Sequence, residues 1–169
     1  QSTFYEANQV IAHPEYKLDV PIKANIAILV LTRPVEFDKT IYPICLWDIP
    51  LSSPSELTRK KVVGFGYGKD STSTDRIKKS SVLQLRSANE CLAEYSFILK
   101  DVSDKSSYFC ANRDNRVSSC IADGAQVYVQ DREIWFLFST LAYHNISSEN
   151  TNSCVSNKPV LLEYLGSYV

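Results

Sequence analysis

The sequence is short of glycine and has no excess of either charge. It holds 5 glycines in 169 residues, about 3% where roughly 7% is usual. Few backbone positions can therefore need a positive φ or a close approach to a ligand. The 18 Lys and Arg residues oppose 19 Asp and Glu residues, for a net charge of −1. A chain so balanced has no field for nucleic acid or anionic lipid, so we expect neither nucleic acid nor a membrane among its partners.

Long apolar runs and metal-ligand spacings are absent as well. The longest clean apolar run, Ile26 to Leu31, is far shorter than the roughly 18 residues of a transmembrane helix. No two cysteines form C-x-x-C, and His13 and His144 lie near no cysteine pair. We therefore expect no metal and no cofactor. The sequon at Asn145 predicts glycosylation, which fits an exported, extracellular protein.

Short strands dominate what is present. Asn25 to Leu31 is continuous and β-branched, as in a buried strand, and Ser81 to Arg86 alternates like a half-buried one. Val62 to Gly68 predicts a strand that runs into a glycine turn, and Lys69 to Lys79 predicts a surface loop. Only the segment after Ser87 has a helix start, with Glu90 three residues later. Further strands are expected at 107–111, 126–129 and 134–142, which predicts an all-β barrel or sandwich.

Landmarks along the whole chain resemble one family. They are Ile11-Ala-His13-Pro14, Asn25-Ile-Ala-Ile-Leu-Val-Leu31, Ile41-Tyr-Pro-Ile-Cys-Leu46, Val63-Gly64-Phe65-Gly66, Phe109-Cys110-Ala111 and Trp135-Phe136-Leu137. In this order they resemble a trypsin-like serine protease domain. The sequence from Pro43 to Trp47 is similar to that of arthropod clip-domain and modular members. The resemblance implies a chymotrypsin-like double β-barrel with a site between the barrels.

The same resemblance implies a domain plan. Residues 1–50 would be the C-terminal part of the first barrel, 51–61 a linker between the barrels, and 62–169 the second barrel. The segment that carries the activation cleavage site and the catalytic histidine would lie upstream, so the first barrel is expected to be incomplete here.

The catalytic positions are degenerate when they are carried over from the family. Asn25 stands where the family has the aspartate, and an amide favours the wrong histidine tautomer and costs about 10⁴ in rate. Gly124 stands where the family has the nucleophilic serine, so no hydroxyl is present. Ala122 stands for the glycine that helps to form the oxyanion hole. We therefore predict no catalytic residues and no enzyme activity.

The positions that would shape the substrate pocket differ too. Ser118 replaces the pocket-bottom aspartate of trypsin-like enzymes, His144 replaces a glycine at the pocket mouth, and Val160 replaces one in its wall. Asp123 matches the aspartate that pairs with the ammonium freed by activation cleavage. It is a candidate activation switch, although a solvated or hydrogen-bonded aspartate is an equal reading.

The five cysteines fit the family's pairing, in which Cys91 bonds to Cys110 and Cys120 to Cys154. Cys45 matches the cysteine that tethers the protease domain to its upstream chain.

Three functions remain open at this stage. The first is a secreted, non-catalytic serine protease homologue that binds other proteases or homologues as a cofactor or regulator of an immune or clotting-type cascade. The second is a secreted or salivary binding module that targets host factors outside such a cascade. The third, an active protease with a relocated nucleophile such as Ser118 or Ser119, has the least support, because neither serine follows the aspartate of the turn.

Overall fold

The computed structural model describes residues 4–19, 22–47, 57, 60–69, 76–86, 88–102, 105–113, 124–144 and 158–168. Contacts divide the chain into two compact units, Gln1–Pro43 and Ile44–Val169. The predicted linker at 51–61 lies mostly outside the described residues, so the expected domain plan stays a prediction. Within the described part of the chain, no helix is both long and apolar enough to cross a membrane.

The first unit is built on a two-stranded antiparallel sheet. Strand β1 (Ala7–Ala12) pairs with β2 (Ala27–Leu31), so that Val10 lies opposite Leu29 and Ile11 opposite Ile28. All four of these side chains are exposed although they are apolar. A sheet of two strands is marginally stable alone, and this one is apolar on both faces.

A loop after β2 is fixed by one carboxylate. The side chain of Asp38 accepts hydrogen bonds from the Thr40 N–H at 2.6 Å, from the Thr40 hydroxyl at 2.8 Å and from the Ile41 N–H at 3.0 Å. These donors, the Thr40 N–H first, lower the pKa of Asp38, because they favour the charged form.

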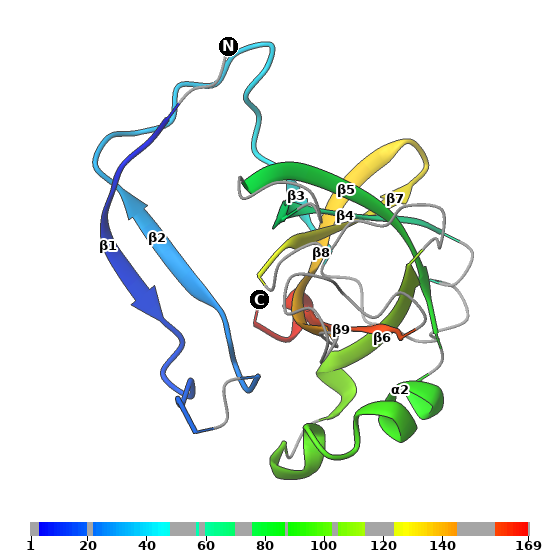
Figure 1. Ribbon diagram of the computed structural model, residues 1–169. Coiled ribbons are helices and arrows are strands. Elements are labelled where there is room, and N and C mark those ends of the chain that lie inside the picture. Colours follow the sequence, from blue (N-terminus) through cyan, green and yellow to red (C-terminus); the bar gives the residue numbers. More distant parts are fainter. Residues whose placement is uncertain are drawn as a thin grey trace. The chain divides into compact units, whose positions relative to one another are not determined.

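The second unit is a closed barrel of six antiparallel strands (Figure 1). Its strands are β4 (Lys61–Lys69), β5 (Arg76–Leu85), β6 (Tyr108–Arg113), β7 (Gln126–Asp131), β8 (Ile134–His144) and β9 (Val160–Tyr164). The spatial order is β8-β7-β4-β5-β6-β9, and pairing of β9 with β8 closes the ring. The short β3 (Cys45–Leu46) adds in parallel to β8. The predicted all-β, chymotrypsin-like class with an incomplete first barrel is confirmed.

Alternation along the strands fills the barrel. Along β4, Val62 points into the core while Phe65 is exposed. Phe138 at the centre contacts the rings of Phe109 and Tyr164, with centroid distances of 5.6 Å and 5.3 Å. Burial of this side-chain set supplies the main stabilisation of the barrel. The core includes Trp47, Leu57, Leu83, Leu85, Ala111, Val127, Val129, Leu141, Val160 and Leu162.

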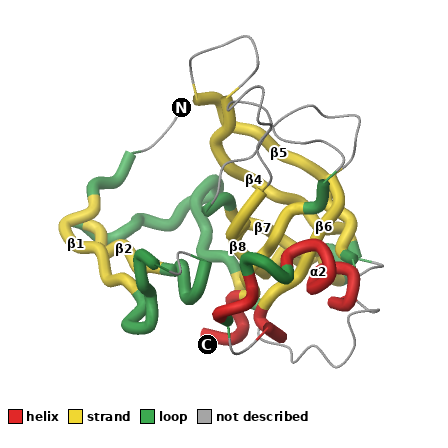
Figure 2. Tube along the Cα trace, turned by 60° about the horizontal axis from the view of Figure 1, so that its bottom comes forward, coloured by secondary structure: helices red, strands yellow, loops and turns green. Residues whose placement is uncertain are grey.

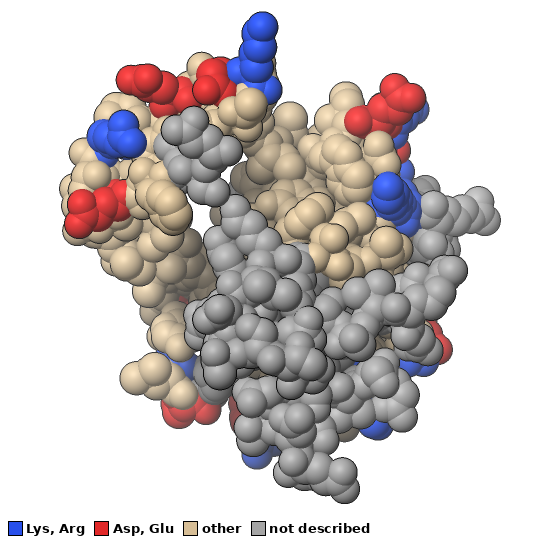
Figure 3. Space-filling view, turned by 45° about the horizontal axis from the view of Figure 1, so that its top comes forward, with Lys and Arg blue, Asp and Glu red and all other residues tan. Residues whose placement is uncertain are grey.

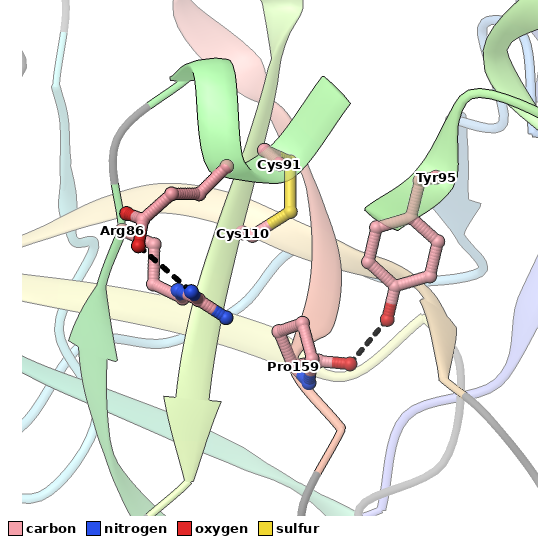
Figure 4. The surroundings of a disulfide bond; sticks show 6 residues. Arg86, Cys91, Tyr95, Cys110 and Pro159 are labelled. Atoms are coloured by element: carbon pink, nitrogen blue, oxygen red, sulfur yellow. Dashed lines mark hydrogen bonds and ion pairs between the residues drawn. A yellow bond between two sulfur atoms is a disulfide. The ribbon is translucent and has the colours of Figure 1, made fainter. Parts of the chain in front are cut away.

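Helical segments cover one side of the barrel (Figure 2). They are α2 (Ala88–Tyr95), which packs on β6, the 3-10 turns η1 (Leu99–Asp101) and η2 (Lys105–Ser107), and η3 (Leu165–Tyr168), which packs on β8. A disulfide between Cys91 and Cys110 joins α2 to β6, with the Cα atoms 5.1 Å apart. The Tyr95 hydroxyl donates to the Pro159 carbonyl just before β9 (Figure 4). Ion pairs at both ends of α2 add to this attachment, Arg86–Glu90 at 2.8 Å and Lys158–Glu94 at 2.7 Å.

Three local predictions are wrong. The strand around Ile28 is not buried, because among the described strands β2 pairs only with β1, and Ile28 and Leu29 stay exposed. Gly64, Gly66 and Gly68 do not end the strand in a turn, because β4 continues through them to Lys69. The segment from Lys69 to Lys79 was expected to be a loop, but both of its ends are strand. Lys69 is the last residue of β4 and pairs with Arg76, where β5 begins. Backbone pairing with β5 outweighs the low strand propensity of glycine.

Candidate functional site

The described residues predicted for the site fall in both units. Asn25 lies in the first unit and Gly124, Val160 and the backbone of His144 lie in the second. Ser118, Ala122, Asp123, Cys120, Cys154 and Asn145 lie outside the described residues, so the predictions made for them stay predictions. Among the described residues, no group of three or more His, Cys, Asp or Glu side chains gathers as metal ligands would.

Asn25 sits in a tight turn that leads into β2. The Ile26 N–H donates to the Ala24 carbonyl at 2.8 Å across Asn25. Ala24 has a φ of 49°, which costs an alanine about 1–2 kcal/mol. The Asn25 side chain is exposed, and within the described residues it has no hydrogen-bond partner. A side chain placed in this way has no rigid neighbour here to fix its direction.

His13 forms two hydrogen bonds that fix the chain next to this turn. Its N–H donates to the Ile26 carbonyl at 3.0 Å, one residue after Asn25. Its ring Nδ1 accepts the Glu15 N–H at 3.2 Å. His13 therefore shapes the end of the hairpin through its backbone and Nδ1, and it follows β1 as part of a turn, as a His-Pro pair predicts.

Gly124 enters the barrel at the start of β7. Its φ is +80°, a conformation that L side chains rarely adopt. Its N–H donates to the Leu141 carbonyl at 2.7 Å, and the Leu141 N–H donates to the Ala125 carbonyl at 2.8 Å. The two bonds extend the β7–β8 ladder through Gly124, and a register shift between Val127 and Tyr128 interrupts the ladder further along.

That pairing bears on the position predicted for Gly124. In the serine protease mechanism, the N–H of the nucleophilic residue is one of the donors that bind the oxyanion. The donor must be free and must point at the reacting oxygen to lower the barrier. The Gly124 N–H is already bound to Leu141, so if Gly124 stands at the nucleophile's position, as the resemblance predicts, the ladder uses that donor.

Of the residues predicted for the substrate pocket, the structure describes Val160 and the backbone of His144. Val160 is fully buried in the barrel core and lies opposite Ala111 and His144. His144 ends β8, and only its backbone is described. Cys45 is exposed on β3 and forms no disulfide with another described cysteine, so its predicted bond to the upstream chain stays a prediction. The predicted bond between Cys91 and Cys110 is confirmed.

On the face drawn in Figure 3 the described Lys and Arg side chains are interspersed with Asp and Glu, and neither sign forms a continuous patch there. This agrees with the net charge of −1.

Sequence reasoning missed the pairing of Gly124 with Leu141. The only signal for it was a glycine immediately before a strand.

Comparison with known proteins gives a consistent family. A family model for Trypsin matches residues 1–124. Ovochymase of Halocynthia roretzi is 26% identical over 146 residues, which are 83% of this chain and 9% of that protein. Melanization protease 1 of Drosophila melanogaster is 29% identical over 75% of this chain and 32% of its own length. Inactive CLIP domain-containing serine protease A28 of Anopheles gambiae is 28% identical over 69% of this chain and 30% of its own length.

Proposed function

This chain belongs to the trypsin family, and we propose that it is a non-catalytic member of that family that acts by binding. The proposed role is that of a partner, cofactor or regulator in an extracellular cascade of proteases. The chain spans about a third or less of the length of the curated relatives named above. The activity and partners of the whole protein are therefore part of the proposal.

The N–H of Gly124 carries this proposal. It lies 2.7 Å from the Leu141 carbonyl oxygen and is used by the barrel ladder. Gly124 also has no side chain, and residues 121–127 contain no serine, threonine or cysteine. Without a nucleophile and without that donor, neither the attack nor the stabilisation of the tetrahedral intermediate is supported.

Asn25 supports the same reading from the first unit. An amide cannot stabilise the imidazolium that forms during catalysis as a carboxylate does. The exposed position of this side chain adds to the argument, because an orienting group works when its surroundings fix it in place.

The cascade role rests on relatives and on redox chemistry. The relatives include a melanization protease and a CLIP-domain protease that is named as inactive. The disulfide between Cys91 and Cys110 supports an oxidising, extracellular compartment. A protein that keeps a protease barrel without its chemistry still offers the surface of a protease to substrates, inhibitors and other proteases.

The test is labelling with a fluorophosphonate probe, which forms a bond only with an activated serine. We expect no labelling of the full-length protein above the level of a denatured sample. We also expect none for Gly124→Ser, because Asn25 and Ala122 remain unchanged. An active trypsin-family protease in the same tube is the positive control. Stoichiometric labelling of any serine, Ser118 and Ser119 included, would show that the protein is catalytic.

A second arm of the experiment tests regulation. The full-length protein is added to an activated CLIP-domain protease and the zymogen that this protease cleaves, and the cleavage rate is followed. A saturable increase or decrease in the rate is expected, and Gly124→Ser should give the same change. If the rate is unaffected at any concentration, the role in such a cascade is wrong even where the labelling result agrees.

A further inference from the structure

The outward side of four adjacent barrel strands carries a row of apolar residues. On β4, Val63 lies opposite Val82 of β5 on one side and opposite Tyr128 of β7 on the other. Tyr128 in turn lies opposite Leu137 of β8. Their strand neighbours Val62 and Leu83 point into the barrel core. We call this surface the outer barrel face, and it consists of Lys61, Phe65, Val82, Tyr128, Trp135 and Leu137 around the buried Val63.

Phe65 of this face is open to solvent yet held in place, and Tyr128 and Trp135 are half-buried. Phe65 is 51% exposed and Val82 is 46% exposed. The Phe65 ring contacts the Tyr128 ring edge to face at 5.7 Å, and the Tyr128 hydroxyl donates to the Gln126 side chain. Partial burial raises the pKa of Tyr128, so this phenol stays neutral. Rings fixed in this way lose little entropy when they are covered.

One cation of the face, Lys61, has no carboxylate partner in the part of the chain that the structure describes. The Lys61 ammonium lies 5.5 Å from the centre of the Trp135 ring, a cation–π contact. Within the described residues no carboxylate lies within ion-pair distance of Lys61. The neighbouring Lys60 differs, because it pairs with Asp131 at 2.6 Å. Lys61 therefore offers a positioned positive charge at the edge of an apolar row.

We propose that the outer barrel face docks a segment of another protein in which an acidic side chain stands beside apolar or aromatic ones. Interface cores are enriched in Phe, Tyr and Trp, and a carboxylate at Lys61 would be complementary in charge. A single cation gives no basis for binding a phosphate backbone. The site lies on the outside of the barrel and does not involve Gly124, so it goes beyond the proposed function and stands whether or not the protein is catalytic.

The opposite side of the barrel supplies matched controls. Phe97 is 60% exposed just after α2, and the Lys100 side chain is 71% exposed on η1. Substitutions there change the same residue types in a helical segment outside the outer barrel face. Phe65→Thr is compared with Phe97→Thr, and Lys61→Glu with Lys100→Glu. Threonine is chosen at residue 65 because it suits a strand position. Lys61→Glu leaves the core intact, so this variant still tests the proposal if Phe65→Thr fails to fold.

The experiment measures binding of the full-length protein to two immobilised peptide libraries. The libraries share fixed Leu and Phe positions, and the adjacent charged position is Glu in one and Lys in the other. We expect selective binding to the Glu library. Phe65→Thr and Lys61→Glu should each weaken it at least about tenfold, as substitutions at interface hot spots do, while both controls bind as the wild type does.

Three outcomes would overturn the proposal. One is equal binding to the two libraries, and another is an equal loss of binding in the control variants. The third is self-association of the protein that disappears in Lys61→Glu, since this would make a second copy of the chain the occupant of the face.

Discussion

Replacing Phe138 with alanine is expected to lower the free energy of unfolding by about 3–5 kcal/mol, the cost of removing a buried aromatic ring from a core. Phe138 is fully buried at the centre of the barrel. Its ring contacts Phe109 at 5.6 Å and Tyr164 at 5.3 Å. These rings come from β6, β8 and β9, so the neighbours cannot collapse into the cavity without moving the strands that close the barrel. Denaturant unfolding of the full-length protein measures the loss.

The control for this prediction is Phe97→Ala. Phe97 is 60% exposed, so its removal leaves no cavity and should change stability by less than about 0.5 kcal/mol. An equal loss for both variants would mean that the barrel core is not centred on Phe138.

Removing the disulfide between Cys91 and Cys110 is expected to lower the free energy of unfolding by about 3 kcal/mol. The two cysteines are 19 residues apart in the sequence, and the chain-entropy estimate for a loop of this size is about 3 kcal/mol. Both sulfurs are buried between α2 and β6, so the double variant Cys91→Ala/Cys110→Ala also loosens the helix on the barrel. Thermal or denaturant unfolding of the oxidised protein gives the difference.

Cys45→Ala is the matched control for the disulfide. Cys45 is exposed and forms no disulfide with another described residue. Its predicted tether to the upstream chain closes no loop within the barrel, so its replacement should leave the unfolding transition of the barrel where it was. If the double variant were as stable as the wild type, α2 would be held by its ion pairs and by the Tyr95 hydroxyl alone.

Much of the barrel could be predicted from the sequence, for reasons visible in single strands. The continuous apolar run around Ile28 and the alternation from Ser81 to Arg86 indicate two strands, and both are strands in the structure. The burial expected for the first of them is wrong, because Ile28 and Leu29 are exposed. The start of α2 was predicted from Glu90, three residues after a capping serine. Its attachment to β6 followed from the family pairing of the cysteines.

The errors in β4 and in the β4–β5 hairpin have one physical cause. Gly64, Gly66 and Gly68 have low intrinsic strand propensity, yet β4 has a partner on each side, β5 and β7. Pairing partners lie far away in the sequence, so their hydrogen bonds have no local signal. The same holds for the ends of the β4–β5 hairpin, where polar residues suggested a loop.

The candidate site, too, could be predicted only in part from the sequence. The sequence indicates which side chains are missing, because a glycine at residue 124 has no hydroxyl in any fold. It does not indicate where the Gly124 N–H points. That depends on Leu141, 17 residues later, and on the register of two strands. The outer barrel face was likewise beyond sequence reasoning, because its residues come from four strands and meet only through the register.

The hydrogen bond of the Gly124 amide is the most direct test of the central claim, that the barrel ladder uses the donor which catalysis would need. In an NMR experiment on the isotope-labelled protein, the scalar coupling across the hydrogen bond between the Gly124 nitrogen and the Leu141 carbonyl carbon is measured together with amide exchange. We predict a detectable coupling and an exchange rate as slow as that of the neighbouring β7 amides. A rapidly exchanging Gly124 amide without coupling would contradict the account, since that N–H would be free to bind an oxyanion.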